Sequence, residues 1–326
     1  MQDEILKLLK EADGGFVSGE EIAARLGVSR TAVWKRIQEL KNLGYEIESL
    51  SRNGYTLKAS PDLLLPVEVK DGLKTEIIGQ NIVYFEDIGS TNNEAKRIAA
   101  QENAPDGTVV VSEAQGGGKG RLSRSWFSPK YKGLWFSVIL RPDFLPQEAP
   151  KCTLLVAVAI AKAVRKFGVA AGIKWPNDIL YEGKKLNGTL TEMSAEMERI
   201  NYVVVGTGIN VNVMPEDFPA DVKDIATSLA IIKGEKLPRK EIFREILTEM
   251  ESLYLEVRKN GFGKVFEEWR KYSVTLGQEV NVIGIGDHES FAGKAIDIDE
   301  DGALLVETEK GVRKVLAGDV SIRPRK

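Results

Sequence analysis

The chain has 326 residues, of which 43% are hydrophobic, and a formal net charge of −3. That length predicts two or three domains with enough apolar residues for their cores. The near-neutral charge excludes a general attraction to nucleic acid or membranes, so any nucleic-acid contact must come from a local patch. We find no signal peptide and no apolar run of transmembrane length, which predicts a cytoplasmic protein with no membrane partner.

The cysteine and histidine content narrows the chemistry. A single cysteine excludes an internal disulfide and a cysteine-based zinc site. Cys152 opens a strongly apolar run, which predicts a buried thiol rather than a nucleophile. The single histidine, His288, lies in an expected turn, where a solvated ring is the default. We therefore expect no metal ligands from the protein itself.

Residues 1 to about 60 predict three helices followed by a hairpin. Ser18, with Glu21 three residues later, forms the capping pattern that opens a helix over Gly19–Leu26. Ser29 opens the next helix, expected over residues 29–43, in which apolar side chains recur at helical spacing. The opposite surface of that helix is mostly basic. An Asn-Gly turn between two alternating arms predicts the hairpin.

Two interpretations of this unit stay open: a packing module with a solvated charged face, or a winged helix-turn-helix that binds DNA. The helix-turn-helix and the wing occur together at suitable spacing, which favours DNA binding. Basic and acidic residues are balanced in the unit, so a dimer on a two-fold site should bind much better than one copy. The predicted DNA-binding residues are Ser29, Arg30, Thr31, Trp34, Lys35, Arg36 and Arg52.

Predicted strands and helices alternate between residue 70 and about residue 270. The expected strands are Ile82–Phe85, Thr108–Ser112, 134–140, 173–175, 189–193 and 202–213. The expected helices are Thr91–Gln101, 153–167 and 242–257. This grouping predicts a mixed sheet with helices on one face. After residue 273, short β-runs separated by turns predict a small five-stranded barrel of the SH3 type.

Four polar segments of the middle region carry more chemistry than a fold requires. Residues 116–126, GGGKGRLSRSW, combine glycines, cations and an aromatic ring, which suits closure over an anionic, nucleotide-like ligand. Taken alone, such a loop is more often a mobile basic surface loop. The other three are residues 89–92 before a helix, KWPND at 174–178 with GKK at 183–185, and GTGIN at 206–210, which places two glycines inside a strand.

In this order and spacing, these motifs resemble the biotin–protein ligase family. The flanking winged helix and C-terminal barrel make the chain similar to the bifunctional bacterial members, which are ligases and biotin-operon repressors. The resemblance covers essentially the whole chain and implies an α+β fold. The implied domains are a winged helix-turn-helix at 1–62, a mixed-sheet α/β catalytic domain of the class II synthetase-like biotin ligase type at 63–272, and an SH3-like domain at 273–326.

The resemblance also implies an activity, that of a biotin–[acetyl-CoA-carboxylase] ligase. Such enzymes join the biotin carboxylate to the α-phosphate of ATP, with Mg²⁺ on the triphosphate, and form biotinyl-5′-AMP. They then pass biotin to a lysine of a biotin carboxyl carrier protein. The adenylate would also act as corepressor, favouring a homodimer that binds operator DNA.

The implied site residues are carried over position by position. The catalytic residues are Lys185 and Arg121. The biotin-binding residues are Ser90, Thr91, Asn92, Gln115, Gly118, Lys119, Lys185, Gly188, Gly206 and Gly208. The residues that bind ATP or the adenylate are Lys119, Arg121, Arg124, Trp126, Asn177, Asp178 and Asn210.

The chain departs from the family pattern at a few positions. Lys119 stands where the loop usually has arginine, and lysine keeps the charge but loses bidentate geometry. Ser123 replaces a glycine, and Asn187 and Thr189 stand where small or apolar residues are usual beside Gly188. We hypothesise that a weaker loop and a more polar pocket wall let the adenylate escape more readily. Three alternatives stay open: a repressor that only senses biotin or its adenylate, a lipoate–protein ligase, and a ligase whose winged helix no longer binds DNA.

Overall fold

The computed structural model describes residues 1–51, 53–101, 104–122, 124–197, 199–284, 289–317 and 320–324. The chain divides into two compact units, Met1–Asp71 and Gly72–Lys326. The first unit therefore includes a segment that the sequence assigned to the start of the catalytic domain. The predictions for Arg52, Ser123 and His288 fall outside the described residues.

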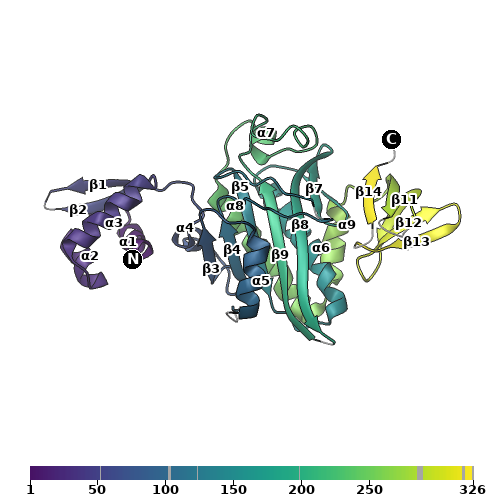
Figure 1. Ribbon diagram of the computed structural model, residues 1–326, viewed down its shortest axis with the longest axis horizontal. Coiled ribbons are helices and arrows are strands. Elements are labelled where there is room, and N and C mark those ends of the chain that lie inside the picture. The colour runs from purple at the N-terminus through teal and green to yellow at the C-terminus, as the bar shows by residue number, and fades with distance from the viewer. Residues whose placement is uncertain are drawn as a thin grey trace. The chain divides into compact units, whose positions relative to one another are not determined.

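The first unit contains the predicted three helices and hairpin (Figure 1). Its elements are α1 (Gln2–Glu11), α2 (Gly19–Leu26), α3 (Arg30–Asn42), β1 (Glu46–Leu50), β2 (Gly54–Ala59) and α4 (Pro66–Lys70). The side chains of Ser18 and Ser29 accept main-chain N–H bonds at 3.0 and 3.2 Å and cap α2 and α3, as predicted. The buried apolar side chains of the helices form one core, with Ile5, Leu6, Leu9, Ile22, Val33, Ile37 and Leu40 at its centre.

A buried carboxylate ties α4 to the helices of this unit. Glu68 of α4 accepts hydrogen bonds from Tyr45 Oη and Lys10 Nζ, each at 3.0 Å. An ionised group in the interior is tolerated only when it is paired and hydrogen-bonded. This pairing explains why the Pro-flanked segment after the hairpin packs with the first unit.

The second unit is built on a seven-stranded sheet in the order β3-β4-β5-β9-β8-β7-β6. Its strands are β3 (Ile82–Phe85), β4 (Thr108–Ser112), β5 (Gly133–Leu140), β6 (Gly172–Lys174), β7 (Asp178–Tyr181), β8 (Lys184–Glu196) and β9 (Arg199–Asn210). The β3–β4 pair is parallel, and the remaining neighbours are antiparallel. The mixed sheet is therefore confirmed.

Helices cover both faces of this sheet, so the prediction that they share one face was wrong. On one face α5 (Thr91–Gln101) packs Ala95 and Ile98 against a core that contains Ile139 of β5. On the other face α8 (Arg239–Asn260) places Phe243 4.8 Å from the ring of Phe136, also in β5. Because side chains alternate along a strand, residues three apart point to opposite faces. The sequence pattern could not show which face each helix chooses.

Several elements were missed or shortened by the sequence analysis. The residues between 176 and 184 were expected to lie between strands, but they contain β7 and the turn into the long strand β8. Glu182 and Gly183 form that turn with positive φ angles of 48° and 79°. The polar, functional composition of this stretch hides the strand pattern. The helices η1 (Pro146–Lys151), α7 (Leu229–Lys233) and α9 (Gly263–Tyr272) were also not predicted, whereas α6 (Cys152–Lys166) was.

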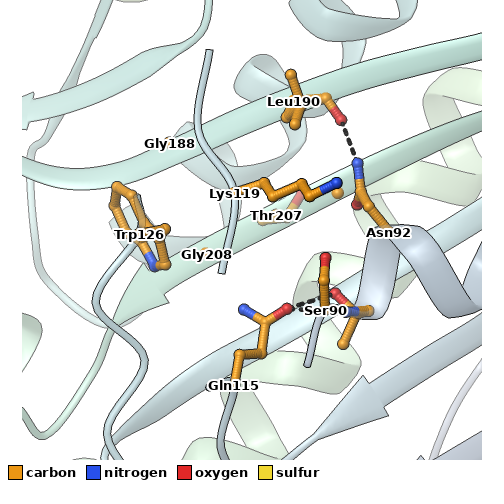
Figure 2. A pocket seen from close by; sticks show the side chains of 11 residues that line it. Ser90, Asn92, Gln115, Lys119, Trp126, Gly188, Leu190, Thr207 and Gly208 are labelled. Atoms are coloured by element: carbon orange, nitrogen blue, oxygen red, sulfur yellow. Dashed lines mark hydrogen bonds between the residues drawn. The ribbon is translucent and has the colours of Figure 1, made fainter. Parts of the chain in front are cut away.

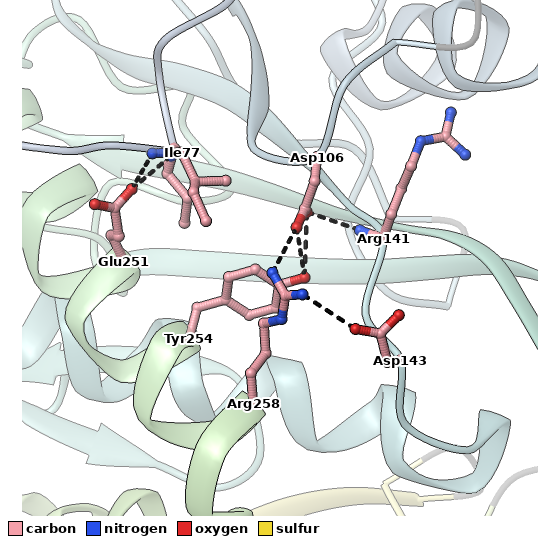
Figure 3. A network of polar contacts seen from close by, with 8 residues as sticks. Ile77, Asp106, Arg141, Asp143, Glu251, Tyr254 and Arg258 are labelled. Atoms are coloured by element: carbon pink, nitrogen blue, oxygen red, sulfur yellow. Dashed lines mark hydrogen bonds and ion pairs between the residues drawn. The ribbon is translucent and has the colours of Figure 1, made fainter.

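Polar contacts fasten α8 to the sheet (Figure 3). Glu251 accepts the main-chain N–H groups of residues 76–78 at 2.6–2.7 Å. Asp106 accepts the main-chain N–H of Arg141 at 2.9 Å and the hydroxyl of Tyr254 at 3.1 Å. Burial and the neighbouring Asp106 carboxylate raise the pKa of Tyr254, which keeps the phenol neutral and donating. These contacts hold α8 in place beneath the sheet.

The C-terminal part forms the predicted five strands, arranged as an antiparallel sheet in the order β13-β12-β11-β10-β14. The strands are β10 (Glu279–Gly284), β11 (Phe291–Ile298), β12 (Leu304–Thr308), β13 (Gly311–Val315) and β14 (Val320–Pro324).

Cys152 is buried as predicted, and burial raises the pKa of its thiol to about 12. Among the helices of the described residues, none has the length and hydropathy needed to span a membrane.

Candidate active site

A small pocket lies on the α5 side of the sheet (Figure 2). Most of its lining residues were predicted to bind biotin: Ser90, Thr91, Asn92, Gln115, Lys119, Gly188, Gly206 and Gly208, joined by Trp126, Leu190 and Thr207. Its cavity of about 20 Å³ holds little more than one water molecule. The pocket is therefore assembled but nearly filled by protein side chains.

The glycines of β8 and β9 make room for two of these side chains. A Cβ atom at Gly206 would overlap the side-chain carbonyl of Asn92, and one at Gly208 would overlap the indole of Trp126. A Cβ at Gly188 would lie 2.9 Å from Trp126 Cζ3 and 3.1 Å from Lys185 Cε. The two strand glycines predicted to allow a close approach thus do so. In this structure protein side chains occupy the space.

Hydrogen bonds organise the polar end of the pocket. Gln115 Oε1 accepts the main-chain N–H of Thr91 at 2.8 Å, and Gln115 Nε2 donates to Ser128 Oγ at 2.9 Å. Ser137 Oγ, in the middle of β5, lies 2.8 Å from Thr91 Oγ1 and 2.6 Å from Asn92 Oδ1. Asn92 Nδ2 in turn lies 2.8 Å from Glu192 Oε2.

Three of the organising residues were not singled out from the sequence: Ser128, Ser137 and Glu192. Ser137 carried a signal, because it is a polar residue inside the apolar run GLWFSVIL and is fully buried. Glu192 carried none, since a charged residue on an expected strand is ordinary at the surface. Its role depends on its neighbour Asn92, which is 100 residues away in sequence.

A β-bulge turns Lys185 to the same face of β8 as Gly188, next to the small pocket but not among its lining residues. Asn187 pairs with Ile179 and Lys185 with Leu180, so Leu186 is an extra residue in β8. Without the bulge, strand alternation would turn Lys185 to the face opposite Gly188. With it, Lys185 Nζ lies 2.7 Å from the Asp178 carboxylate and 5.3 Å from the centroid of the Trp126 ring. The bulge thus brings the predicted catalytic lysine beside the predicted nucleotide residues.

The main chain at Lys185 is held by a segment distant in sequence. Lys185 N–H donates to Ile225 O at 2.7 Å, and its carbonyl accepts from Thr227 N–H at 2.9 Å. Asn210 Nδ2 donates to Thr227 O at 3.0 Å. The amide group of Asn210, predicted to bind adenylate, therefore holds the segment 225–227 that contacts the main chain of Lys185.

The other predicted cation, Arg121, lies close to the KWPND segment. Its guanidinium donates to Asn177 Oδ1 at 3.1 Å and to the main-chain carbonyl of Ala317. Burial lowers the pKa of Arg121, and the nearby Asp178 carboxylate opposes that shift. Arg121, Lys185 and Asp178 thus form one charged cluster.

The remaining loop residues surround the same pocket. Lys119 Nζ donates to Asn93 Oδ1 at 2.9 Å. The carbonyl of Arg124 accepts the Gly120 N–H at 2.7 Å, which closes the loop on itself. A Cβ atom at position 118 would clash with the Trp126 carbonyl, so only glycine fits there. The glycine-rich loop is therefore folded over the pocket by its own main chain.

Asn187 and Thr189 do not line the pocket, which corrects the idea of a more polar pocket wall. They alternate with Gly188, whose missing side chain would point at Trp126, so their side chains turn to the opposite face. Thr191, next on that face, is hydrogen-bonded to Thr153 of α6 at 2.7 Å. The sequence showed that these residues were unusual but not where they pointed.

The first unit presents the predicted DNA-binding residues that the structure describes on and beside α3. Trp34 is 55% exposed, and Arg30, Thr31 and Lys35 are also exposed. Ser29 caps the helix, and Arg36 is paired with Glu39 at 2.6 Å. A surface hollow lies between α3 and the hairpin, lined by Arg30, Thr31, Trp34, Ser49, Leu50, Ser51, Gly54 and Tyr55, with Ser18, Gly19 and Glu20 from the start of α2.

Comparison with known proteins places this architecture among biotin ligases. The profile of the biotin/lipoate A/B protein ligase family matches residues 84–210, that of an HTH domain residues 2–56, and that of the biotin protein ligase C terminal domain residues 275–323. The biotin protein ligase from Aquifex aeolicus, solved in complex with biotin and ATP, is 30% identical with a TM-score of 0.65. That likeness covers 76% of this chain and 100% of that one.

Full-length relatives narrow the class further. The chain is 42% identical over 323 residues to the bifunctional ligase/repressor BirA of Bacillus subtilis (strain 168), which covers 99% of this chain and 98% of that protein. It is 30% identical over 315 residues to the protein of the same name from Escherichia coli (strain K12), covering 96% and 94%. The chain therefore belongs to the biotin–protein ligase family, in its group of bifunctional ligase/repressors.

Proposed function

We propose that this protein is an ATP-dependent biotin–protein ligase. A biotin carboxylate oxygen attacks the α-phosphorus of ATP, pyrophosphate leaves, and biotinyl-5′-AMP forms. The amine of a lysine on a biotin carboxyl carrier protein then attacks the acyl carbon, and AMP leaves. The first step joins two negative groups, so it needs positive charge fixed at the reacting centre.

The observation that carries this proposal is the placement of Lys185. The bulge in β8 turns its ammonium group to the glycine-floored pocket, beside Asp178 and the Trp126 ring. An ammonium there can neutralise the carboxylate and the α-phosphate as they approach. Arg121 adds a second cation to the same cluster, and Trp126 offers the adenine a stacking surface.

Mg²⁺ would enter as part of the MgATP substrate. Within the described residues no group of three or more His, Cys, Asp or Glu side chains is gathered as a metal site. Asp178 supplies one carboxylate beside the reacting groups, which fits an ion held chiefly by phosphate oxygens. We therefore expect the triphosphate to provide most of its ligands.

The intact mass of a biotin carrier domain tests the ligase. The domain is incubated with the protein, ATP, Mg²⁺ and biotin, and with lipoate instead of biotin in a parallel reaction. We expect a gain of one biotinyl group, which Lys185→Ala abolishes. No gain with biotin would leave a protein that only senses the ligand, and a gain with lipoate alone would make it a lipoate ligase.

We further propose that the first unit represses transcription as part of a dimer formed when the adenylate is bound. The exposed Arg30, Trp34 and Lys35 on α3 support binding in a DNA groove. Duplexes selected from a random library in the presence of biotin and ATP provide the probe. Sedimentation should show dimers with the adenylate, and Lys35→Ala should weaken binding to the selected duplex while ligation continues.

A further inference from the structure

Four oxygen atoms form a row across the polar end of the pocket. In order they are Gln115 Oε1, Thr91 Oγ1, Ser137 Oγ and Asn92 Oδ1. Successive atoms are 3.1, 2.8 and 2.6 Å apart, which are hydrogen-bond distances. Three contacts of this kind need three protons, one between each pair of oxygens. We call these atoms the oxygen row.

The Gln115 end of the oxygen row can only accept. Gln115 Oε1 already accepts the main-chain N–H of Thr91 at 2.8 Å, and Gln115 Nε2 donates to Ser128 at 2.9 Å. The Ser128 hydroxyl is free to accept because its own proton points to the carbonyl of Trp126 at 3.3 Å. Turning the Gln115 amide would place its NH₂ against the Thr91 N–H, so the amide is fixed.

The Asn92 end can also only accept, because the amide nitrogen of Asn92 faces two acceptors. One is the Glu192 carboxylate, and the other is the Leu190 carbonyl, whose contact with Asn92 Figure 2 shows. Asn92 Nδ2 lies 2.8 Å from the Glu192 carboxylate and 3.3 Å from the carbonyl of Leu190, and both of these groups are acceptors. Burial raises the pKa of Glu192, but hydrogen bonds from Lys96, at 2.6 Å, and from Asn92 outweigh it and lower the pKa overall. The carboxylate is therefore ionised and holds the Asn92 amide with its oxygen towards Ser137.

The oxygen row is consequently one proton short. Its two hydroxyl groups, on Thr91 and Ser137, supply two protons for three contacts. Of the described residues, none donates to the row beyond the Thr91 N–H at its end. Thr91, Ser137 and Asn92 are buried, and every oxygen of the row has a hydrogen-bond partner, but one of the three O···O contacts has no proton between its atoms. When the two hydroxyl protons point inward to Ser137 and Asn92, the oxygens of Gln115 and Thr91, both of which line the pocket, can accept a ligand N–H.

We propose that Glu192 is a specificity-determining residue that acts through Asn92. By fixing the orientation of the Asn92 amide, it keeps the oxygen row short of a proton and makes the pocket select a ligand that carries N–H donors, such as a cyclic urea. This inference rests on the proposed binding of biotin, whose ureido ring carries such donors. Gly206 contributes the space in which the Asn92 oxygen lies.

Glu192→Gln tests the proposal. A glutamine at this position can accept from Lys96 and donate to Asn92, so that only the more distant Leu190 carbonyl, at 3.3 Å, still opposes a turned Asn92 amide that supplies the missing proton to Ser137. Calorimetric titration of the full chain with biotin, without ATP, should then show affinity reduced by about 10- to 100-fold. Desthiobiotin, which keeps the ureido N–H groups, should lose affinity by the same factor. In the ligase reaction the KM for biotin should rise, with kcat and the KM for ATP unchanged.

Two matched variants separate this role from a structural one. Lys96→Met removes the ion pair but leaves the carboxylate, and Glu196→Gln makes the same charge change at an exposed position of β8. Both should bind biotin within about twofold of the wild type. Glu192→Gln binding equally well, or Lys96→Met losing as much affinity, would overturn the proposal.

Thermal unfolding without ligand tests the inference in a way that does not depend on biotin binding. Glu192→Gln and Lys96→Met both lose the ion pair, but only the glutamine variant completes the oxygen row. It should therefore unfold at the higher temperature of the two, and an equal or lower temperature would contradict the inference. Failure of the wild type to bind biotin, with this order of stabilities intact, would count against the proposed function alone.

Discussion

The two faces of β8 and β9 differ sharply over the same few residues. The pocket face carries Gly188, Gly206 and Gly208, and the space above them holds Asn92 and Trp126. The opposite face carries Asn187 and Thr189, where Asn187 Oδ1 and the Thr189 hydroxyl find no partner among the described residues. The pocket face has glycines that leave space for other side chains, and the opposite face has buried polar atoms without a partner. Strand alternation keeps the two roles apart.

The largest effect should follow from adding a side chain at a glycine on the pocket face. Gly206→Ala places a methyl group on the Asn92 carbonyl, which must move and break its contact with Ser137. Overpacking of this kind costs about 1–3 kcal/mol, so we expect biotin affinity to fall by up to about 100-fold. Calorimetric titration with biotin measures this affinity. Unchanged affinity would show that Asn92 has room to shift without consequence.

A smaller effect on the same face should come from Trp126→Ala. The indole lies against Gly188 and Gly208 in the pocket and is predicted to stack on adenine, so its removal should affect the two substrates differently. The KM for ATP should rise about tenfold, as expected for the loss of an aromatic stack. Biotin binding without ATP should not weaken, because the cavity becomes larger. Weaker biotin binding together with an unchanged KM for ATP would assign the indole to biotin instead.

On the opposite face, Thr189→Val should stabilise the protein. It removes a buried hydroxyl without a partner among the described residues, and we expect about 1 kcal/mol more free energy of unfolding. Thr191→Val is the matched control, because that hydroxyl is bonded to Thr153 at 2.7 Å and its loss should destabilise by about 1 kcal/mol. Urea denaturation compares them. The same sign for both variants would contradict the distinction.

The smallest effect concerns pH and the charged edge of the pocket face. The Lys96 and Asn92 hydrogen bonds hold the pKa of Glu192 below its ordinary unfolded value, so its contribution to stability is present above that value and is lost as the pH falls through the folded-state pKa. Glu192→Gln should therefore make stability fall less steeply in acid, by at most about 1 kcal/mol for a partly exposed pair. Urea midpoints measured between pH 3 and pH 6 would detect it, and parallel curves would show that the pair contributes nothing.

The local elements were within reach of the sequence because their signals are local. Ser18 and Ser29 cap the helices that their positions predict, and β3, α5 and β4 begin and end where the pattern placed them. The glycine motifs correctly marked positions of close approach. The order of the motifs along the chain also indicated the family before any geometry was known.

Tertiary structure alone decided which way the site residues point. The bulge at Leu186 turns Lys185 to the pocket, whereas Asn187 and Thr189 face away from it. Asn92 meets Glu192 across 100 residues of sequence, and neither residue type announces the pairing. A shift of one residue in strand register exchanges the two faces, and register is set by contacts between distant segments. The sequence therefore determined which groups are available, and the register of the sheet determined which of them meet.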